Sequence, residues 1–99
     1  MALRKAYRVS RLAEADIDAI YSYTVKNWSG SQADAYYATI IAAFEGLTSG
    51  AKIGHAAAID GYFALRVGSH SVFYRVADDT VFVARVLHQA MDVESHLNP

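Results

Sequence analysis

Three arginines are the residues of this sequence whose type and spacing could do chemistry. Arg66, Arg75 and Arg85 each interrupt an apolar, β-rich run. A guanidinium in such a strand either reaches the sheet edge or points into an open groove, where it can bind a phosphate or a carboxylate. Grouped on a face that no helix covers, the three predict a positive patch for a phosphate, an RNA backbone or an acidic protein segment. The alternative is a set of structural ion pairs with acids, namely Asp60, Asp92 or Glu94.

Other candidates for chemistry are weaker. Tyr74, beside Arg75, could stack or act as a general base, although a tyrosine in a strand usually serves packing. A metal site of His88, Asp92 and His96 would spread its ligands over two helical turns, too far apart for one ion. The sequence contains no glycine-rich phosphate loop, no nucleophile elbow and no zinc-binding helix motif. We therefore expect no metal, no cofactor and no catalytic residue.

Composition narrows the class of protein. The chain has 99 residues, 54% of them hydrophobic, which predicts a single domain spanning residues 1–99 with one core. A net charge of −1 argues against direct sequence-specific nucleic-acid binding, and no apolar run is long enough to span a membrane. Cysteine is absent, and the first residues lack a signal-peptide core. We expect a cytoplasmic protein, and the low charged fraction of 19% suggests a partner.

The first half of the chain predicts a strand followed by an antiparallel helical hairpin. Residues 3–9 alternate in polarity and end at Ser10, which suits a strand leading into a helix N-cap. Helical spacing then covers 11–28, with a stripe ending at Trp28, and 32–48. Ser31 and Asp34 resemble a capping box for the second helix. The stripe of this second helix that we expect to be buried consists of Ala33, Tyr36, Tyr37, Ile40, Phe44 and Leu47.

The second half predicts a three-stranded meander after a loop. Residues 48–61 are rich in glycine and alanine and favour a loop. The predicted strands are 62–67, 70–77 and 80–87, and residues 88–99 form a C-terminal tail. With a two-residue turn at Gly68-Ser69, we expect the core face to hold Leu65, Val67, Val72, Tyr74 and Val76. The turn at Asp78-Asp79 could also include Thr80, which would move Arg85 from the Val72 side to the Phe73 side. The sequence leaves this register open.

Two motifs resemble a known family. The run L-R-V-G-S-H-S-V-F-Y-R-V from Leu65 to Val76 is similar to the family run R-x-x-x-V-G-x-H-x-I-F-Y-R-V. The run R-V-L-H-Q-A-M-D from Arg85 to Asp92 is similar to its ending R-V-L-H-x-x-M-D. Together with the order of predicted elements, these motifs resemble the ParE branch of the RelE/ParE toxin superfamily nearly end to end. The resemblance implies an α+β fold.

The resemblance also implies a function. It implies the toxin of a type II toxin–antitoxin system that inhibits DNA gyrase by binding and is neutralised by a cognate ParD-like antitoxin. Such a toxin would not be an enzyme. Two alternatives stay open, a ribosome-dependent mRNA endoribonuclease of RelE type and a degenerate toxin that keeps only antitoxin binding. The small number of basic residues around the predicted meander argues against the endoribonuclease, because binding RNA depends on neutralising phosphates.

The expected partner surface combines the arginines with the motif ending. We expect an acidic, amphipathic antitoxin segment to lie against Arg66, Arg75 and Arg85, using apolar grooves along the hairpin and a sheet edge. The full set of candidate residues for target or antitoxin binding is Arg66, Tyr74, Arg75, Arg85, His88, Met91 and Asp92.

Overall fold

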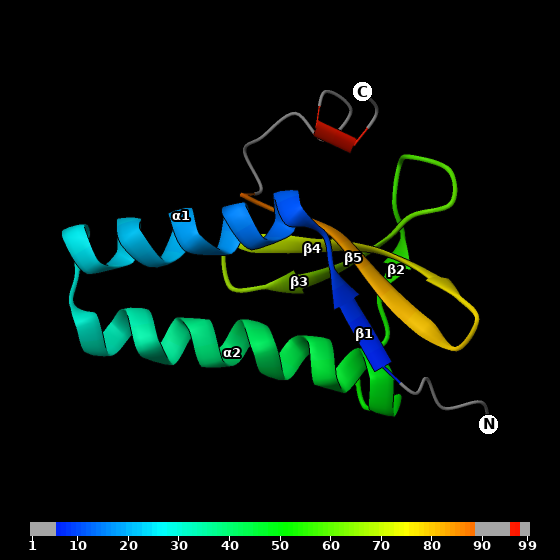
Figure 1. Cartoon of the computed structure of the whole chain (residues 1–99), viewed down its shortest axis with the longest axis horizontal. Coiled ribbons are helices and arrows are strands. Elements are labelled where there is room, and N and C mark those ends of the chain that lie inside the picture. The colour runs from blue at the N-terminus through cyan, green and yellow to red at the C-terminus, as the bar shows by residue number, and fades with distance from the viewer. Residues whose placement is uncertain (1–5, 89–95, 98–99) are drawn as a thin grey trace.

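The computed structural model describes residues 6–88 and 96–97 and has the predicted α+β architecture. Its elements are β1 (Ala6–Val9), α1 (Arg11–Asn27), α2 (Gly30–Ser49), β2 (His55–Ala56), β3 (Phe63–Val67), β4 (His70–Ala77) and β5 (Thr80–His88). They form one sheet with the order β1-β5-β4-β3-β2, in which β1 runs parallel to β5 (Figure 1). The predicted meander is therefore confirmed, and the first strand extends it at β5. The predicted positions 3–5 and most of the tail lie outside the described residues.

Both helices begin at serine N-caps. The Ser10 side chain accepts a hydrogen bond from Ala13 N, at 3.0 Å, and starts α1. The Ser29 side chain accepts from Gln32 N, at 3.1 Å, so the expected capping box of Ser31 and Asp34 is wrong. Only Trp28 and Ser29 separate the helices, so α2 starts two residues early, and the Asp34 carboxylate instead accepts the hydroxyl of Tyr21 on α1.

The sheet buries apolar side chains on both of its faces. The helix-covered face forms the larger core, centred on fully buried Phe44 and Ile40 of α2. All five strand residues expected on this face lie there. On the opposite face, Ala64, Phe73 and Leu87 form a smaller cluster with Leu97. The expected α2 stripe is correct except at Tyr37, which is 46% exposed because it packs edge-on against Tyr21 on the outer side of the hairpin.

A bulge resolves the register that the sequence left open. The turn at Asp78-Asp79 has two residues, both with positive φ, and pairs Ala77 with Thr80. Farther along, Tyr74 pairs with Val83 but Phe73 pairs with Arg85, so Ala84 is an extra residue in β5. The turn that alone would place Arg85 opposite Val72 thus leaves it opposite Phe73.

Two parts of residues 48–61, the segment expected to be a loop, form regular secondary structure instead. Helix α2 continues through Ser49 and ends at Gly50, whose φ of +84° suits a glycine C-cap. His55 and Ala56 then pair with Ala64 and Phe63 and add the edge strand β2. In the part of the chain that the structure describes, neither helix combines the length and the apolar character that a membrane span requires.

Candidate functional site

An open groove runs between the helical hairpin and the ends of β4 and β5. Its volume is about 950 Å³, and its lining is mainly apolar and aromatic. The hairpin tip extends beyond the strands of the sheet in Figure 1. From α1 and its C-cap the wall includes Ile20, Tyr23, Thr24 and the C-cap residue Trp28. From α2 it includes Gln32, Ala35, Tyr36 and Thr39.

Two large side chains at the tip are unusually exposed. Trp28 is 71% exposed and Tyr23 is 65% exposed, and both line the groove. Burying either ring on a partner would remove a large apolar area from water. An exposed aromatic groove of this kind marks a binding site for another molecule, such as an amphipathic helix.

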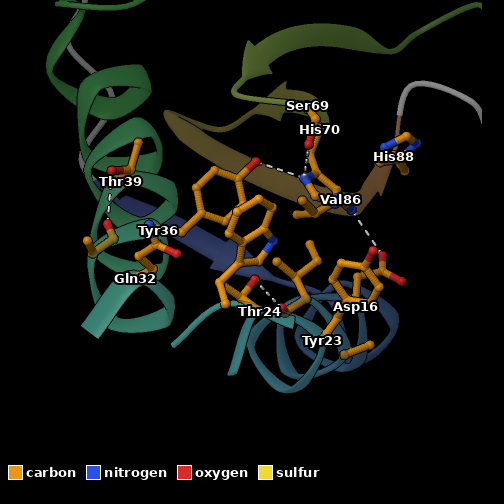
Figure 2. A pocket seen from close by; sticks show the side chains of 14 residues that line it. Asp16, Tyr23, Thr24, Gln32, Tyr36, Thr39, Ser69, His70, Val86 and His88 are labelled. Carbon is orange, nitrogen blue, oxygen red and sulfur yellow. Dashed lines mark hydrogen bonds between the residues drawn. The ribbon is translucent and has the colours of Figure 1, made fainter. Parts of the chain in front are cut away.

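Tyr36 and His70 form the polar floor of the groove, as Figure 2 shows. The Tyr36 hydroxyl donates to Val67 O at 2.9 Å and lies 2.7 Å from His70 Nδ1. Since the hydroxyl has one proton and gives it to the carbonyl, Nδ1 must carry the hydrogen that it donates to the tyrosine oxygen. This arrangement assigns the tautomer of the neutral His70 ring, with its lone pair on Nε2.

Burial lowers the pKa of His70 below its usual value, and the nearby charge of His88 lowers it further, while Asp16 partly opposes both effects. His88 is the cross-strand partner of His70, with ring centroids 5.4 Å apart. The neutral ring is therefore the form that the folded protein favours.

We expect acid to destabilise the fold through His70. Because the folded pKa is below the unfolded value of about 6.5, the unfolded chain binds more protons as the pH falls past 6.5. The neutral His70 ring thus makes its full contribution to the free energy of unfolding above this pH. That contribution is lost as the pH falls toward the pKa of His70 in the folded protein. Urea unfolding between pH of about 7.5 and 5 should show a smaller loss of stability in His70→Gln than in the unchanged protein. The control is His55→Gln, because His55 is exposed, and an equal loss in all three proteins would contradict this assignment.

Asp16, which lines the groove, forms an ion pair with Arg85 beside the end of β1. Arg85 Nε and Nη2 each donate to the Asp16 carboxylate at 2.8 Å and form a bidentate ion pair. The Arg85 side chain is only 16% exposed and the Asp16 side chain only 14%. The same carboxylate accepts Val86 N at 3.0 Å. Because β1 stops at Val9, this backbone N–H of β5 has no strand beside it, and Asp16 takes the place of one. The hydrogen bonds from Arg85 to Asp16 raise the pKa of the guanidinium.

Comparison with known proteins identifies the family. A family model described as "ParE toxin of type II toxin-antitoxin system, parDE" matches residues 7–93. The chain belongs to the ParE toxin family. Toxin ParE1 of Caulobacter vibrioides is 39% identical over 95 residues, covering 94% of this chain and 98% of that protein. Toxin ParE1 of Mycobacterium tuberculosis strain H37Rv is 37% identical over 94 residues, covering 92% and 96%.

Solved structures confirm the expected fold. The chromosomal ParDE toxin–antitoxin system of P. aeruginosa contains a chain that superposes with a TM-score of 0.77 at 21% identity, covering 89% of this chain and 98% of that one. The toxin–antitoxin complex RelBE2 of Mycobacterium tuberculosis gives 0.62 at 20% identity, covering 92% and 98%. This ParE chain is the toxin of a type II toxin–antitoxin system of the ParDE kind.

The three arginines predicted from the sequence each make a different contact. Arg85 is held by Asp16, an acid outside the set of pairing partners considered above. Arg66 is exposed, and its Nε donates to Gly68 O at 2.6 Å within the β3–β4 turn. Arg75 is exposed on the helix-free face, with its guanidinium 5.7 Å from the centre of the Tyr62 ring.

Of the four other candidate residues of this ParE toxin, one lies in the core and one lines the groove. Tyr74 is 5% exposed, and its hydroxyl accepts Gly54 N at 2.9 Å, so it anchors the chain before β2. His88 lines the groove. Met91 and Asp92 lie outside the described residues.

Several groove residues were missed as site residues in the sequence. Trp28 and Tyr36 were assigned to helix stripes, and His70 only to a strand. A signal was present in Tyr23 and Trp28, two large aromatic residues at the tip of a hairpin, which the elements of residues 6–88 leave exposed. Among residues 6–88 and 96–97, no group of three or more acidic, histidine or cysteine side chains could hold a metal ion. The triad of His88, Asp92 and His96 includes a residue outside that part.

Proposed function

We propose that this toxin inhibits DNA gyrase by binding and is neutralised by a ParD-like antitoxin whose amphipathic helix occupies the groove. The observation that carries the antitoxin part is the groove itself, about 950 Å³ with Tyr23 and Trp28 exposed at its mouth. Membership of the ParE family supports the gyrase part. The place of action would be the cytoplasm.

Binding rather than catalysis fits the polar groups of the site. Arg85 donates through Nε and Nη2 to Asp16 and through Nη1 to His96 O, and the Tyr36 hydroxyl gives its proton to Val67 O, so neither is poised to act on a substrate. A supercoiling assay with purified gyrase tests the proposal. We expect the folded toxin to stop supercoiling or to trap cleaved DNA at about micromolar concentration, and its antitoxin to restore activity. Folded toxin that leaves gyrase active would refute the gyrase part.

A RelE-type endoribonuclease is the second candidate. The observation that favours it is His70, a neutral histidine that lines the open groove and could act as a general base. Primer extension on mRNA after induction separates the two functions. Codon-linked cleavage would support the endoribonuclease, since an inhibitor that only binds gyrase cannot produce it.

Blocking the groove should release the antitoxin. Ala35 is an exposed groove residue of α2, so Ala35→Glu adds bulk and charge at the proposed contact without altering the core. We expect antitoxin affinity, measured by calorimetry, to fall about a hundredfold or more. Ala38→Glu is the matched control, because Ala38 is exposed on the same helix and does not line the groove. Equal affinities of the two variants would place the antitoxin helix elsewhere.

A further inference from the structure

The helix-free face of the sheet carries a row of alternating cationic and aromatic side chains. Phe82 of β5 pairs with Arg8 of β1 on one side and with Arg75 of β4 on the other. Tyr62, just before β3, continues the row, since the Arg75 guanidinium lies 5.7 Å from its ring centre. The neighbours Tyr7, Val76 and Val81 pack into the core under the helices, so these four side chains take the opposite face.

The charges of the row are available to a partner. Arg8 and Arg75 are both exposed, and the one ion pair formed within the described residues joins Arg85 to Asp16. Phe82 belongs to neither apolar cluster and is partly exposed. Arg75 lies against Tyr62 at cation–π distance, which holds its guanidinium in place while leaving its donors accessible.

The spacing of the row suits a single extended segment. Adjacent strands lie about 4.8 Å apart, which puts the backbones of Arg8 and Arg75 roughly 10 Å from one another across Phe82. Two carboxylates of an extended segment could each meet one guanidinium, while an apolar side chain between them covers Phe82.

We propose that the row of Arg8, Phe82, Arg75 and Tyr62 is the surface by which this toxin binds an acidic protein segment of its target. The proposal rests on the proposed function, in which the target is gyrase. The row and the groove lie on opposite faces of the sheet, so an antitoxin helix in the groove leaves the row open. This proposal replaces the expectation from the sequence that the antitoxin contacts Arg75. The toxin thus has two binding surfaces that can be separated by mutation.

A protein segment fits the row better than a nucleic acid does. Nucleic-acid affinity depends on neutralising many phosphates, and the row offers two arginines. Asp78 and Asp79 form the turn just beyond Phe82 and Arg75, and they would repel a phosphate chain that continues along the strands. A short segment with two carboxylates can end before that turn.

The double variant Arg8→Glu/Arg75→Glu tests the proposal in the full chain. We expect half-inhibition of gyrase supercoiling to require at least about ten times more of this variant, while antitoxin affinity stays within roughly twofold. The matched control is Arg11→Glu/Lys26→Glu, which makes the same charge change at exposed helix positions. Circular dichroism and thermal unfolding verify that each variant folds. Equal inhibition of gyrase by both double variants would overturn the proposal. A loss of antitoxin affinity in Arg8→Glu/Arg75→Glu but not in the control would also overturn it.

A direct binding arm works without gyrase. The probes are a fluorescent peptide of alternating glutamate and phenylalanine, its glutamine counterpart and a single-stranded oligothymidine. We expect the glutamate peptide to bind the unchanged toxin at least about fivefold more tightly than either other probe binds it. We expect the same peptide to bind the Arg8→Glu/Arg75→Glu variant at least about fivefold more weakly than it binds the unchanged toxin. Tighter binding of oligothymidine would assign the row to nucleic acid and overturn the proposal. If the unchanged toxin does not inhibit gyrase, the gyrase function fails, and this arm still decides whether the row binds an acidic segment.

Discussion

Replacing Asp16 with alanine is expected to lower the free energy of unfolding by about 3 kcal/mol. The substitution leaves the Arg85 guanidinium largely buried without its carboxylate and leaves Val86 N without its acceptor. Both interactions are made at the edge of β5, beside the point where β1 ends and α1 begins. Urea unfolding followed by circular dichroism measures the change.

The neighbouring acid of α1 provides the control. Asp18 is exposed, and Asp18→Ala should change stability by less than about 0.5 kcal/mol. Arg85→Met should cost less than Asp16→Ala, because Asp16 can still accept from Val86 N in that variant. A loss for Asp16→Ala no larger than that for Asp18→Ala would show that this ion pair does not hold the sheet edge.

The regular elements were predictable because their signals are local. The stripes of α1 and α2 and the alternation of β3, β4 and β5 each depend on side chains a few residues apart. The Gly68 and Asp78-Asp79 turns were predictable for the same reason, since the residue types needed at positive φ are in the turns themselves. Errors at the start of α2 came from choosing between two nearby serines.

The role of Arg85 could not be predicted, because three distant facts determine it. Ala84 inserts a bulge that changes the pairing of β5, the parallel pairing of β1 stops at Val9, and Asp16 lies 69 residues away in the chain. Each of these depends on the tertiary arrangement. The sequence pattern showed an arginine in an apolar strand but contained no information on which carboxylate would meet it.

A groove along the hairpin was expected, but its residues were missed because periodicity assigns a face to a helix without saying how far its partner extends. Trp28 continues the α1 stripe, as expected, yet it is 71% exposed because the sheet ends before the hairpin tip. The cationic row was missed for a related reason. Arg8 and Arg75 are 67 positions apart in the chain, and both pair with Phe82 only because β1 adds in parallel to β5. The antitoxin and target surfaces proposed for this toxin thus both arise from pairings between distant segments.

The position of Gly68 leads to the second large effect, on stability and on the groove together. Gly68 has a φ of +57° at the first position of the β3–β4 turn. A Cβ at this position would lie 2.7 Å from both the Cε1 and the hydroxyl oxygen of Tyr36. Gly68→Ala is therefore expected to cost about 3 kcal/mol, of which the backbone conformation accounts for about 1 and the displaced ring for the rest.

Gly61 separates these two contributions. Its φ is +86°, and a Cβ there would meet nothing within 4 Å, so Gly61→Ala should cost about 1 kcal/mol and leave antitoxin affinity unchanged. In Gly68→Ala the displaced Tyr36 ring would instead lose its hydrogen bonds to Val67 O and His70. Since Tyr36 and His70 form the groove floor, the groove would change shape. We expect that variant to bind antitoxin at least about tenfold more weakly under conditions where both proteins remain folded. Equal effects of the two alanines on stability and affinity would mean that backbone strain explains both, and that the antitoxin does not contact the groove floor.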